Sequence, residues 1–456
     1  MRRLYDRSQI NWNNMMFSRQ DLKKLLIPLM FEQLLTSFMG MADTMMVSRV
    51  GSAAISAVSL VDSINVLMIQ LLSAMATGGT ILCSQYIGKN DLKRANQAAR
   101  QVVLTVLMIS IPIGLLCFLF REPLLALIFG SVDPEVMKDG VAYFYFTSLS
   151  FPFIALFETG AAFYRAGGNS RFPMTLSVIC NGLNIAGNAV FIFAFQMGTA
   201  GAALSTLLSR IISGVVIFYF LRKPAQQIVI DHYLDIRPDF QMIRRVLSLS
   251  VPSGVENSMF QFGKLVIQSS VSLLTTTQIA ANAMVVVFEN LNGIGGIGIG
   301  IGLMTVVGQC VGAGRNEEAK YYIVKITAVA EGVVALSCLI VFLLCRPAMW
   351  LAGMEPEAAR LSFDMMIYVS VVKPIVWTCA FVPAYGMRSA GDVKFSMIMS
   401  SLTMWLCRVL MTTVMIRVLG FGPIAVWIGM SSDWLCRNIG YSIRFLSGKW
   451  LKHKVI

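Results

Sequence analysis

Two carboxylates lie inside a stretch of sequence that is otherwise apolar, residues 25–47. Glu32 and Asp43 are eleven residues apart, so on an α-helix both point to the same side within about 20°. Their separation along the helix axis would be roughly 16 Å. Because an ionisable group inside a bilayer is costly, it normally faces a cavity or a partner. These residue types in this setting predict the binding of a cation or a proton within a membrane.

A second apolar stretch, residues 173–194, carries Asn184 and Asn188, which are four residues apart and share a helix face. With Asp43 they form the first candidate site, because carboxylate and amide oxygens suit Na⁺, whereas a buried carboxyl group can hold a proton instead. Alternatively, the asparagines bond neighbouring helices, and Asp43 is a solvated residue near the outer interface. No metal beyond Na⁺ at Asp43 is expected, because both histidines lie in polar segments and C-x-x-C pairs are missing.

The composition indicates a membrane protein built of helices. Of 456 residues, 56% are hydrophobic and 13% are charged, whereas a soluble domain carries about 25% charged residues. Twelve apolar segments have about 20 residues or more, the length needed to cross the hydrocarbon core. The predicted spans are residues 25–47, 55–82, 101–120, 141–165, 173–194, 199–221, 246–271, 279–308, 322–345, 363–387, 395–417 and 422–446.

The basic residues predict the orientation of these spans. With the N-terminus inside, 25 Lys and Arg residues lie in the inside segments or at the adjoining span ends, and 6 lie in the outside loops or at the span ends next to them. We therefore expect both termini in the cytoplasm. The same distribution accounts for most of the net charge of +13, so no nucleic-acid partner is expected.

The two halves of the chain repeat each other. A gap-free offset of 224 residues, which later slips to 222 or 223, pairs prolines, glycines and polar residues. Six spans per repeat is an even number, so both repeats enter the membrane from the same side, an arrangement typical of transporters. The pairs include Pro28/Pro252, Glu32/Glu256, Gly78/Gly302, Gln85/Gln309, Arg165/Arg388 and Gly198/Gly420.

The repeat predicts the domain organisation of the chain. Each half forms one lobe of six spans, and polar segments precede, join and follow the lobes. The expected segments are a cytoplasmic N-terminal segment (1–24), the N-lobe (25–221), a cytoplasmic linker (222–245), the C-lobe (246–446) and a cytoplasmic tail (447–456).

The repeat also separates the two acids of the first span. Glu32 has a twin in Glu256, whereas the residue opposite Asp43 is Ile267. The twin acids follow a proline, and each can bond a backbone group that the proline leaves free. We interpret Glu32 as structural first, with ion coupling as the alternative, and Asp43 as the coupling residue.

The second half contains a larger set of charges within its predicted spans. These residues form either a buried network that neutralises itself and fixes packing, or a second site for a proton or a substrate. Asp433 and Arg437 can pair across one helical turn, and Lys373 and Trp377 at the same spacing permit a cation–π contact. The set comprises Glu256, Lys264, Glu289, Lys373, Arg408, Asp433 and Arg437.

Short motifs run along the chain in order, namely Pro28-x3-Glu32 with Asp43 and Gly51, Gln85-Tyr-Ile-Gly88, Arg165-Ala-Gly-Gly-Asn169, Asn184-x3-Asn188, Gln309-Cys-Val-Gly-Ala-Gly314 and Arg388-Ser-Ala-Gly-Asp392. Each motif is weakly specific alone. Together, in order and duplicated, they resemble the MATE (multidrug and toxic compound extrusion) family over residues 20–446. The ending Asp433-Trp-Leu-Cys-Arg437 with Arg444-Phe-Leu-Ser-Gly-Lys-Trp450 is similar to a bacterial branch of that family.

The resemblance implies an all-α membrane protein in which the twelve spans form two six-helix lobes, arranged as a V about a pseudo-twofold axis. It implies a secondary-active multidrug exporter of amphipathic, cationic compounds, which exchanges them for inward H⁺ or Na⁺ by alternating access. The acid of the first span, here Asp43, would take the coupling ion. The family often has an aspartate where this chain has Asn188, which leaves Asp43 with fewer acidic neighbours.

The same resemblance implies no cofactor, no use of ATP and a place in the bacterial cytoplasmic membrane, and we expect a monomer. A flippase for lipids or lipid-linked oligosaccharides, from the same wider superfamily, is the main alternative. A membrane-embedded enzyme is disfavoured because clustered catalytic groups are missing from the sequence. A channel is disfavoured because duplicated lobes with inward acids are typical of alternating access.

Overall fold

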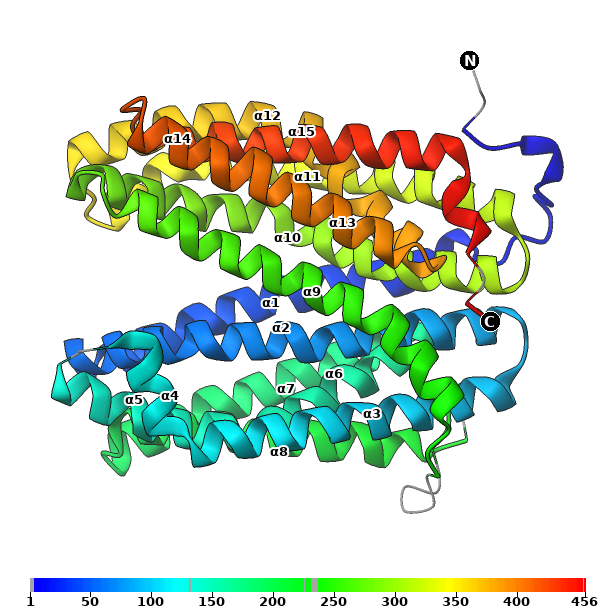
Figure 1. Cartoon of the computed structure of the whole chain (residues 1–456), viewed down its shortest axis with the longest axis horizontal. Helices are drawn as coiled ribbons and strands as arrows, with labels where there is room; N and C mark the ends of the chain where they lie inside the picture. Colours follow the sequence, from blue (N-terminus) through cyan, green and yellow to red (C-terminus); the bar gives the residue numbers. More distant parts are fainter. Residues whose placement is uncertain (1–3, 131–132, 225, 231–236, 454) are drawn as a thin grey trace. The chain divides into compact units, whose positions relative to one another are not determined.

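A computed structural model describes residues 4–130, 133–224, 226–230, 237–453 and 455–456. Within these residues every regular element is a helix (Figure 1). The α-helices are α1 (Arg19–Ser48), α2 (Ser52–Gly88), α3 (Leu92–Leu119), α4 (Arg121–Phe129), α5 (Pro134–Leu149), α6 (Phe151–Ala166), α7 (Arg171–Asn188), α8 (Gly198–Leu221), α9 (Phe240–Val271), α10 (Thr276–Gly312), α11 (Asn316–Leu351), α12 (Pro356–Ser389), α13 (Val393–Thr403), α14 (Met411–Arg417) and α15 (Ile424–Ser447). Two π-helical segments, η2 (Ala189–Ala194) and η3 (Met404–Leu410), and two short 3₁₀ helices, η1 (Arg7–Gln9) and η4 (Lys449–Lys452), complete the list.

Each of the twelve predicted spans lies in one helix or in consecutive helical segments. By length and hydropathy, nine of the described helices can cross a membrane, or ten if α5 and α6 count as one bent span. Two further helices, α9 and α15, complete the predicted set, and both carry charged residues among their apolar ones. The predicted all-helical membrane fold is therefore confirmed.

The predicted span over residues 141–165 is broken into two helices. α5 and α6 meet at Ser150 with a bend of 44°, where Pro152 near the start of α6 removes a backbone donor. The Ser150 hydroxyl donates to the Thr147 carbonyl and accepts a hydrogen bond from Arg210 of α8, each at 2.6 Å. The hydroxyl group at the bend, that of Ser150, is thus a hydrogen-bond acceptor for Arg210 of α8.

The described chain packs into two compact units. The N-unit is Leu34–Gly254, and the C-unit combines Met1–Gln33 with Val255–Ile456. The division falls inside α1 and inside α9, whereas the predicted lobes 25–221 and 246–446 divide in the polar segments between helices. The first part of α1 thus packs with the second half of the chain, and the first part of α9 packs with the first half.

Glycines explain this exchange of helix segments. A Cβ atom at Gly298 of α10 would lie 2.9 Å from the backbone of α1. One turn further, Gly302 faces Leu26 of α1, and its repeat partner Gly78 of α2 faces Ser250 of α9. Leu26 and Ser250 are themselves 224 residues apart, so the same close approach occurs once in each unit.

We expect Gly298→Ala to lower the free energy of unfolding by about 1–3 kcal/mol, because an added methyl group meets backbone atoms that cannot turn aside. The midpoint of thermal unfolding in detergent would measure this loss. Gly332→Ala on α11 is the control, since a Cβ there has nothing within 4 Å. Equal midpoints for the two variants would contradict the close packing of α1 on α10.

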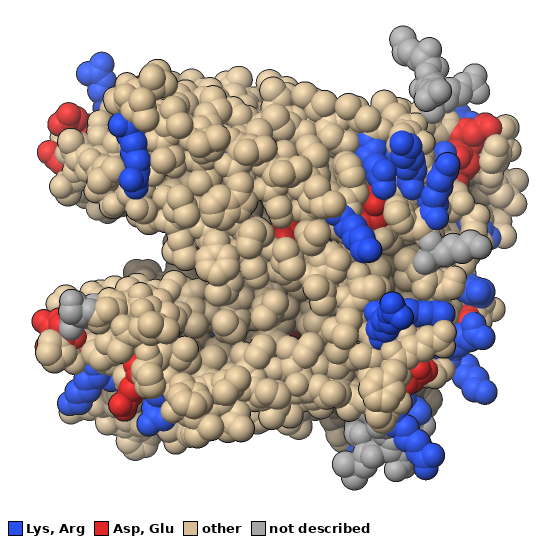
Figure 2. Space-filling view, in the orientation of Figure 1, with Lys and Arg blue, Asp and Glu red and all other residues tan. Residues whose placement is uncertain are grey.

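The two units use related helices at their centres. In the N-unit, α2 packs against α3, α5 and α6, and in the C-unit, α10 packs against α11 and α12. Outside these cores, many large apolar side chains are exposed, among them Met45, Leu127, Leu343, Ile375 and Ile443. Figure 2 shows, on the face drawn of each unit taken by itself, that Lys, Arg, Asp and Glu side chains gather toward the ends and that the surface between them is almost free of charge. This surface suits hydrocarbon rather than water.

The described part of the N-terminal segment is held against α11. The Met16 backbone N–H donates to Glu318 Oε1 at 2.6 Å, and the Tyr322 hydroxyl donates to the Phe17 carbonyl at 2.7 Å. The segment predicted as a cytoplasmic N-terminal segment thus makes specific contacts with α11 of the C-unit.

Candidate functional site

The three residues of the first candidate site lie together in the N-unit. Asn188, buried at the end of α7, donates from Nδ2 to Asp43 Oδ1 of α1 at 2.7 Å. The amide of Asn184 has two possible orientations, and one of them gives both its nitrogen and its oxygen a hydrogen-bond partner. In that orientation Nδ2 donates to Asp43 Oδ1 and Oδ2, at 2.9 and 3.2 Å, and Oδ1 accepts from the hydroxyl of Thr206 on α8. The structure therefore brings together the acid and both amides that the sequence singled out.

A second acid lies close to this group, and its surroundings were not predicted. Asp62 of α2 accepts hydrogen bonds at Oδ1 from Asn65 Nδ2 at 3.1 Å and from the Tyr143 hydroxyl at 3.2 Å. The charges of Asp62 and Asp43 interact. The i,i+3 spacing of Asp62 and Asn65 on α2 is a signal that could have found the pair, whereas nothing in the sequence connects Tyr143 of α5 to them.

One cation interacts electrostatically with both acids without forming an ion pair with either among the described residues. The charge of Arg210 on α8 interacts with Asp43 and Asp62, but its Nη1 is bonded to Ser150. Throughout the residues that the structure describes, no Lys or Arg nitrogen lies within 4.0 Å of either carboxylate. Amide and phenol donors therefore hold these acids, and the second acid gives Asp43 the acidic neighbour that Asn188 does not supply.

This arrangement can hold a cation or a proton. The carboxylate of Asp43 has no ion-pair partner to displace, and in the described structure the buried Oδ1 of Asn188 has no hydrogen-bond partner. Rotating an asparagine amide exchanges a donor for an acceptor at the same place. The two amides can therefore donate to an ionised Asp43, accept from a protonated one, or present oxygen to Na⁺.

We expect Asn188→Ala to reduce coupled transport about tenfold, because a hydrogen bond to a charged group contributes about 1.5–3 kcal/mol. Efflux rates in proteoliposomes would measure the effect. Asn181→Ala is the matched control, since Asn181 lies on the same helix and its amide donates to Ser177, at 3.3 Å, rather than to an acid. Similar rates for both variants would contradict a role for the Asn188–Asp43 bond.

The remaining N-terminal candidate, Glu32, is buried on the part of α1 that belongs to the C-unit. Its repeat twin Glu256 binds Arg388 Nη2 at 2.5 Å. That partner is a side chain rather than the backbone group that we predicted. Because Arg388 belongs to the recurring motif of the second half, Glu256 ties two helices of the C-unit together.

The three acids of the charged set predicted in the second half are thus each paired with a cation. Besides Glu256, Glu289 Oε1 accepts from Lys373 Nζ at 2.5 Å, and Asp433 Oδ1 accepts from Arg437 Nε at 2.7 Å. The predicted pairing across one turn of α15 is confirmed, as is the cation–π contact of Lys373 with Trp377, at 5.1 Å.

Two cations of the predicted set, Lys264 and Arg408, differ from the others. Their charged groups lie over the same ring, Phe260, with Lys264 Nζ at 4.8 Å and Arg408 Cζ at 5.3 Å from its centroid. For the described residues, neither cation has a carboxylate oxygen within 4.0 Å. The structure therefore does not join all seven charges of the predicted set into one neutral network.

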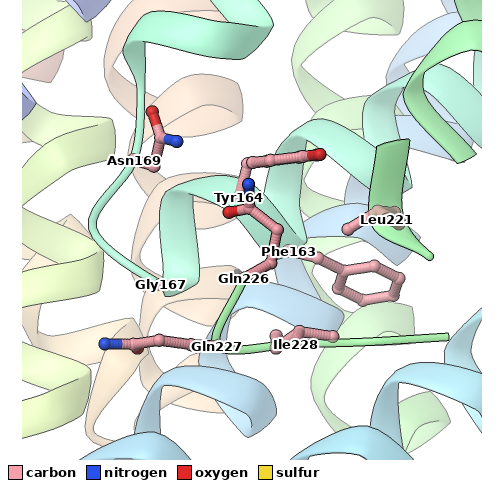
Figure 3. A pocket seen from close by; sticks show the side chains of 8 residues that line it. All are labelled: Phe163, Tyr164, Gly167, Asn169, Leu221, Gln226, Gln227 and Ile228. Atoms are coloured by element: carbon pink, nitrogen blue, oxygen red, sulfur yellow. The ribbon is translucent and has the colours of Figure 1, made fainter. Parts of the chain in front are cut away.

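A cavity of about 240 Å³ lies elsewhere in the N-unit, where residues 226–228 cover the ends of α6 and α8 (Figure 3). Its lining includes Phe163, Tyr164 and Leu221 and none of the Asp43 neighbours. It is therefore separate from the candidate site. Within the described ranges no group of three or more His, Cys, Asp or Glu side chains could hold a metal ion.

Comparisons with known proteins concern the chain as a whole. A family model described as MatE matches residues 28–190 and again residues 252–414, once in each half of the chain. The "Probable multidrug resistance protein NorM" of Thermotoga maritima is 25% identical over 447 residues, which cover 96% of this chain and 94% of that protein. The "Multidrug resistance protein PmpM" of Pseudomonas aeruginosa is 25% identical over 402 residues, with 85% and 82% covered.

Solved structures show the same fold. One described as the "Outward-facing conformation of a multidrug resistance MATE family transporter of the MOP superfamily" aligns with a TM-score of 0.85 and 19% identity, covering 94% of this chain and 96% of that one. Another, "Crystal structure of MATE in the bent conformation", aligns with a TM-score of 0.86 and 18% identity, covering 95% and 97%. At these identities the likeness concerns the fold.

Proposed function

Because this chain belongs to the MatE family of transporters, we propose that it is a secondary-active exporter in which inward H⁺ or Na⁺ binds at Asp43 and drives the efflux of amphipathic small molecules. One observation supports the proposal most directly. Asp43 lies in a membrane-spanning helix and is held by the amides of Asn184 and Asn188, with no cation within ion-pair distance among the described residues. A carboxylate kept in this way inside a bilayer is costly unless it binds a cation or proton.

The proposed coupling starts with a change of charge. A bound Na⁺ or proton neutralises Asp43, and the two amides then turn from donors into acceptors. Asp62 and Arg210 add one charge of each sign beside the site, so the sum of charges around Asp43 depends on whether its ion is bound. Because α1 continues from the C-unit into the N-unit, the altered bonding acts on a helix that the two units share.

The substrates proposed are the amphipathic, cationic compounds that the family resemblance implies, released on the outer side of a bacterial cytoplasmic membrane. The names of the relatives from Thermotoga maritima and Pseudomonas aeruginosa, both multidrug resistance proteins, support this choice. The orientation proposed places both termini in the cytoplasm, as the distribution of Lys and Arg predicts.

Efflux from proteoliposomes tests the proposal. Purified protein is reconstituted with ethidium inside, and a Na⁺ gradient and a pH gradient are imposed in separate experiments. We expect ethidium to leave the proteoliposomes faster than it leaves protein-free liposomes under one of the two gradients. Without a gradient, we expect it to leave the proteoliposomes slowly. Efflux that no ion gradient accelerates, or that requires ATP, would refute secondary-active export, and movement of labelled lipid alone would indicate the flippase.

A further inference from the structure

Two positive side chains share one aromatic ring in the C-unit. Lys264 and Phe260 are one turn apart on α9, and Arg408 approaches from the π-helical segment η3. Arg408 is buried, with 8% of its surface exposed, whereas Lys264 is exposed. The close approach of α9 and η3 is allowed by Gly263, where a Cβ would meet the side chain of Met404.

The acids near these cations are already engaged. Glu289 interacts with the charges of both Lys264 and Arg408, but its carboxylate is bonded to Lys373 at 2.5 Å. Asp433, the other acid that interacts with Arg408, is bonded to Arg437. In the described structure the buried Nε of Arg408 has no hydrogen-bond partner. A buried donor without an acceptor and a neighbouring like charge are both unfavourable, and an anion placed between them removes both costs.

Lys264 and Arg408 lie near the repeat counterparts of the candidate site in the N-unit. Lys264 stands opposite Gly40, one turn before the counterpart of Asp43, and the offset of 222 or 223 in this part of the chain places the counterpart of Asn184 at residue 406 or 407, next to Arg408. A π-helical segment follows or includes the polar residue in both halves, as η2 after Asn188 and as η3 around Arg408. Such segments often occur at functional sites. The C-unit thus has cations within one helical turn of the counterparts of Asp43 and Asn184.

We propose that Lys264 and Arg408 bind the carboxylate of an amphipathic substrate, so that the exporter takes compounds with an acidic group. The proposal rests on the efflux function above. Arg408 Nε and the Lys264 ammonium donate to the two carboxylate oxygens, a geometry that charge-assisted hydrogen bonds favour. The exposed side of Lys264 lets the substrate reach the site, and Phe260 packs against its carbon skeleton. A zwitterion would combine this group with the cationic amine expected from the resemblance.

Equilibrium binding of naphthoate and of the matching neutral naphthamide to the full-length protein in nanodiscs tests the proposal. We expect wild-type protein to bind naphthoate at least about tenfold more tightly than naphthamide. Lys264→Gln and Arg408→Gln are each expected to weaken naphthoate binding by about tenfold and to leave naphthamide binding unchanged. Arg346→Gln is the matched control, because the exposed Arg346 also lies over a ring, Phe363 at 3.9 Å, and should have no effect.

Equal affinities for the acid and the amide in wild-type protein would overturn the proposal, as would unchanged naphthoate binding in Lys264→Gln. If Arg408→Gln fails to fold, as judged by its elution volume, Lys264→Gln decides alone, since Lys264 is exposed. Binding of naphthoate by wild-type protein without gradient-driven efflux would disprove the exporter and retain the carboxylate site. Gradient-driven efflux without preferential binding of naphthoate would disprove the site alone.

Discussion

Asp43→Asn is expected to reduce gradient-driven efflux of ethidium to the level of protein-free liposomes while the protein stays folded. The substitution keeps the shape of the side chain and its ability to bond Asn184 and Asn188, but it removes the ionisable group. An amide cannot take up a proton, and its single oxygen carries no charge to attract Na⁺. The measurement is the initial efflux rate under the gradient that drives the wild-type protein, with the thermal unfolding midpoint as the check on folding.

The control for this variant is Asp364→Asn, the same change at an exposed position of α12, for which we expect the wild-type rate. Asp62→Asn provides a second comparison, because Asp62 has its own donors in Asn65 and Tyr143. Wild-type efflux by Asp43→Asn would remove Asp43 from the coupling mechanism. If Asp62→Asn alone stopped efflux, the coupling residue would be Asp62.

The long helices were predictable because hydropathy and length are properties of continuous segments. The span over residues 141–165 was predicted as one helix, yet the chain bends by 44° at Ser150. A window of apolar residues cannot show such a bend, since it depends on where the Pro152 break lets α6 pack. The grouping of α1 with the second half likewise depends on the contact of Gly302 with Leu26, which only the folded chain brings together.

Some residues of the candidate site could likewise be predicted from the sequence, and others could not. Asp43, Asn184 and Asn188 could be named from their residue types, their helical spacing and the family resemblance, and the fold brings them into contact. Tyr143 and Arg210 could not be connected to them, because they lie on other helices whose faces sequence spacing does not align. The same holds for Lys264 and Arg408, which share Phe260 although they are far apart in the chain.

The roles of the charges in the C-unit can be separated by the Lys373–Glu289 pair. Lys373 is 1% exposed, and its Nζ donates both to the carboxylate and to the backbone carbonyl of Glu289, at 2.5 and 2.7 Å. We expect Glu289→Gln to lower the free energy of unfolding by about 3–5 kcal/mol, because it leaves a buried ammonium without its counter-charge. The thermal unfolding midpoint, followed by tryptophan fluorescence in detergent, measures this loss.

The matched control is Lys320→Gln, which breaks the partly exposed Lys320–Glu317 pair on α11 and is expected to cost at most about 1 kcal/mol. The double variant Glu289→Leu with Lys373→Met removes both charges and is expected to recover most of the lost stability. A Glu289→Gln protein as stable as Lys320→Gln would contradict the burial of an obligatory ion pair.

Efflux by the double variant then distinguishes the two hypotheses for these charges. If the pair only fixes packing, the stable double variant should transport at a rate near that of wild type, because its helices remain in place. If the pair forms part of a proton or substrate site, the same protein should be stable and inactive.

The double variant Glu289→Leu/Lys373→Met also changes the charges near the proposed carboxylate site of Lys264 and Arg408. Removal of the negative charge of Glu289 favours the binding of naphthoate, whereas removal of the positive charge of Lys373 opposes it. Because Glu289 interacts with both Lys264 and Arg408, whereas Lys373 is bonded to Glu289 itself, we expect the affinity to change by less than about tenfold.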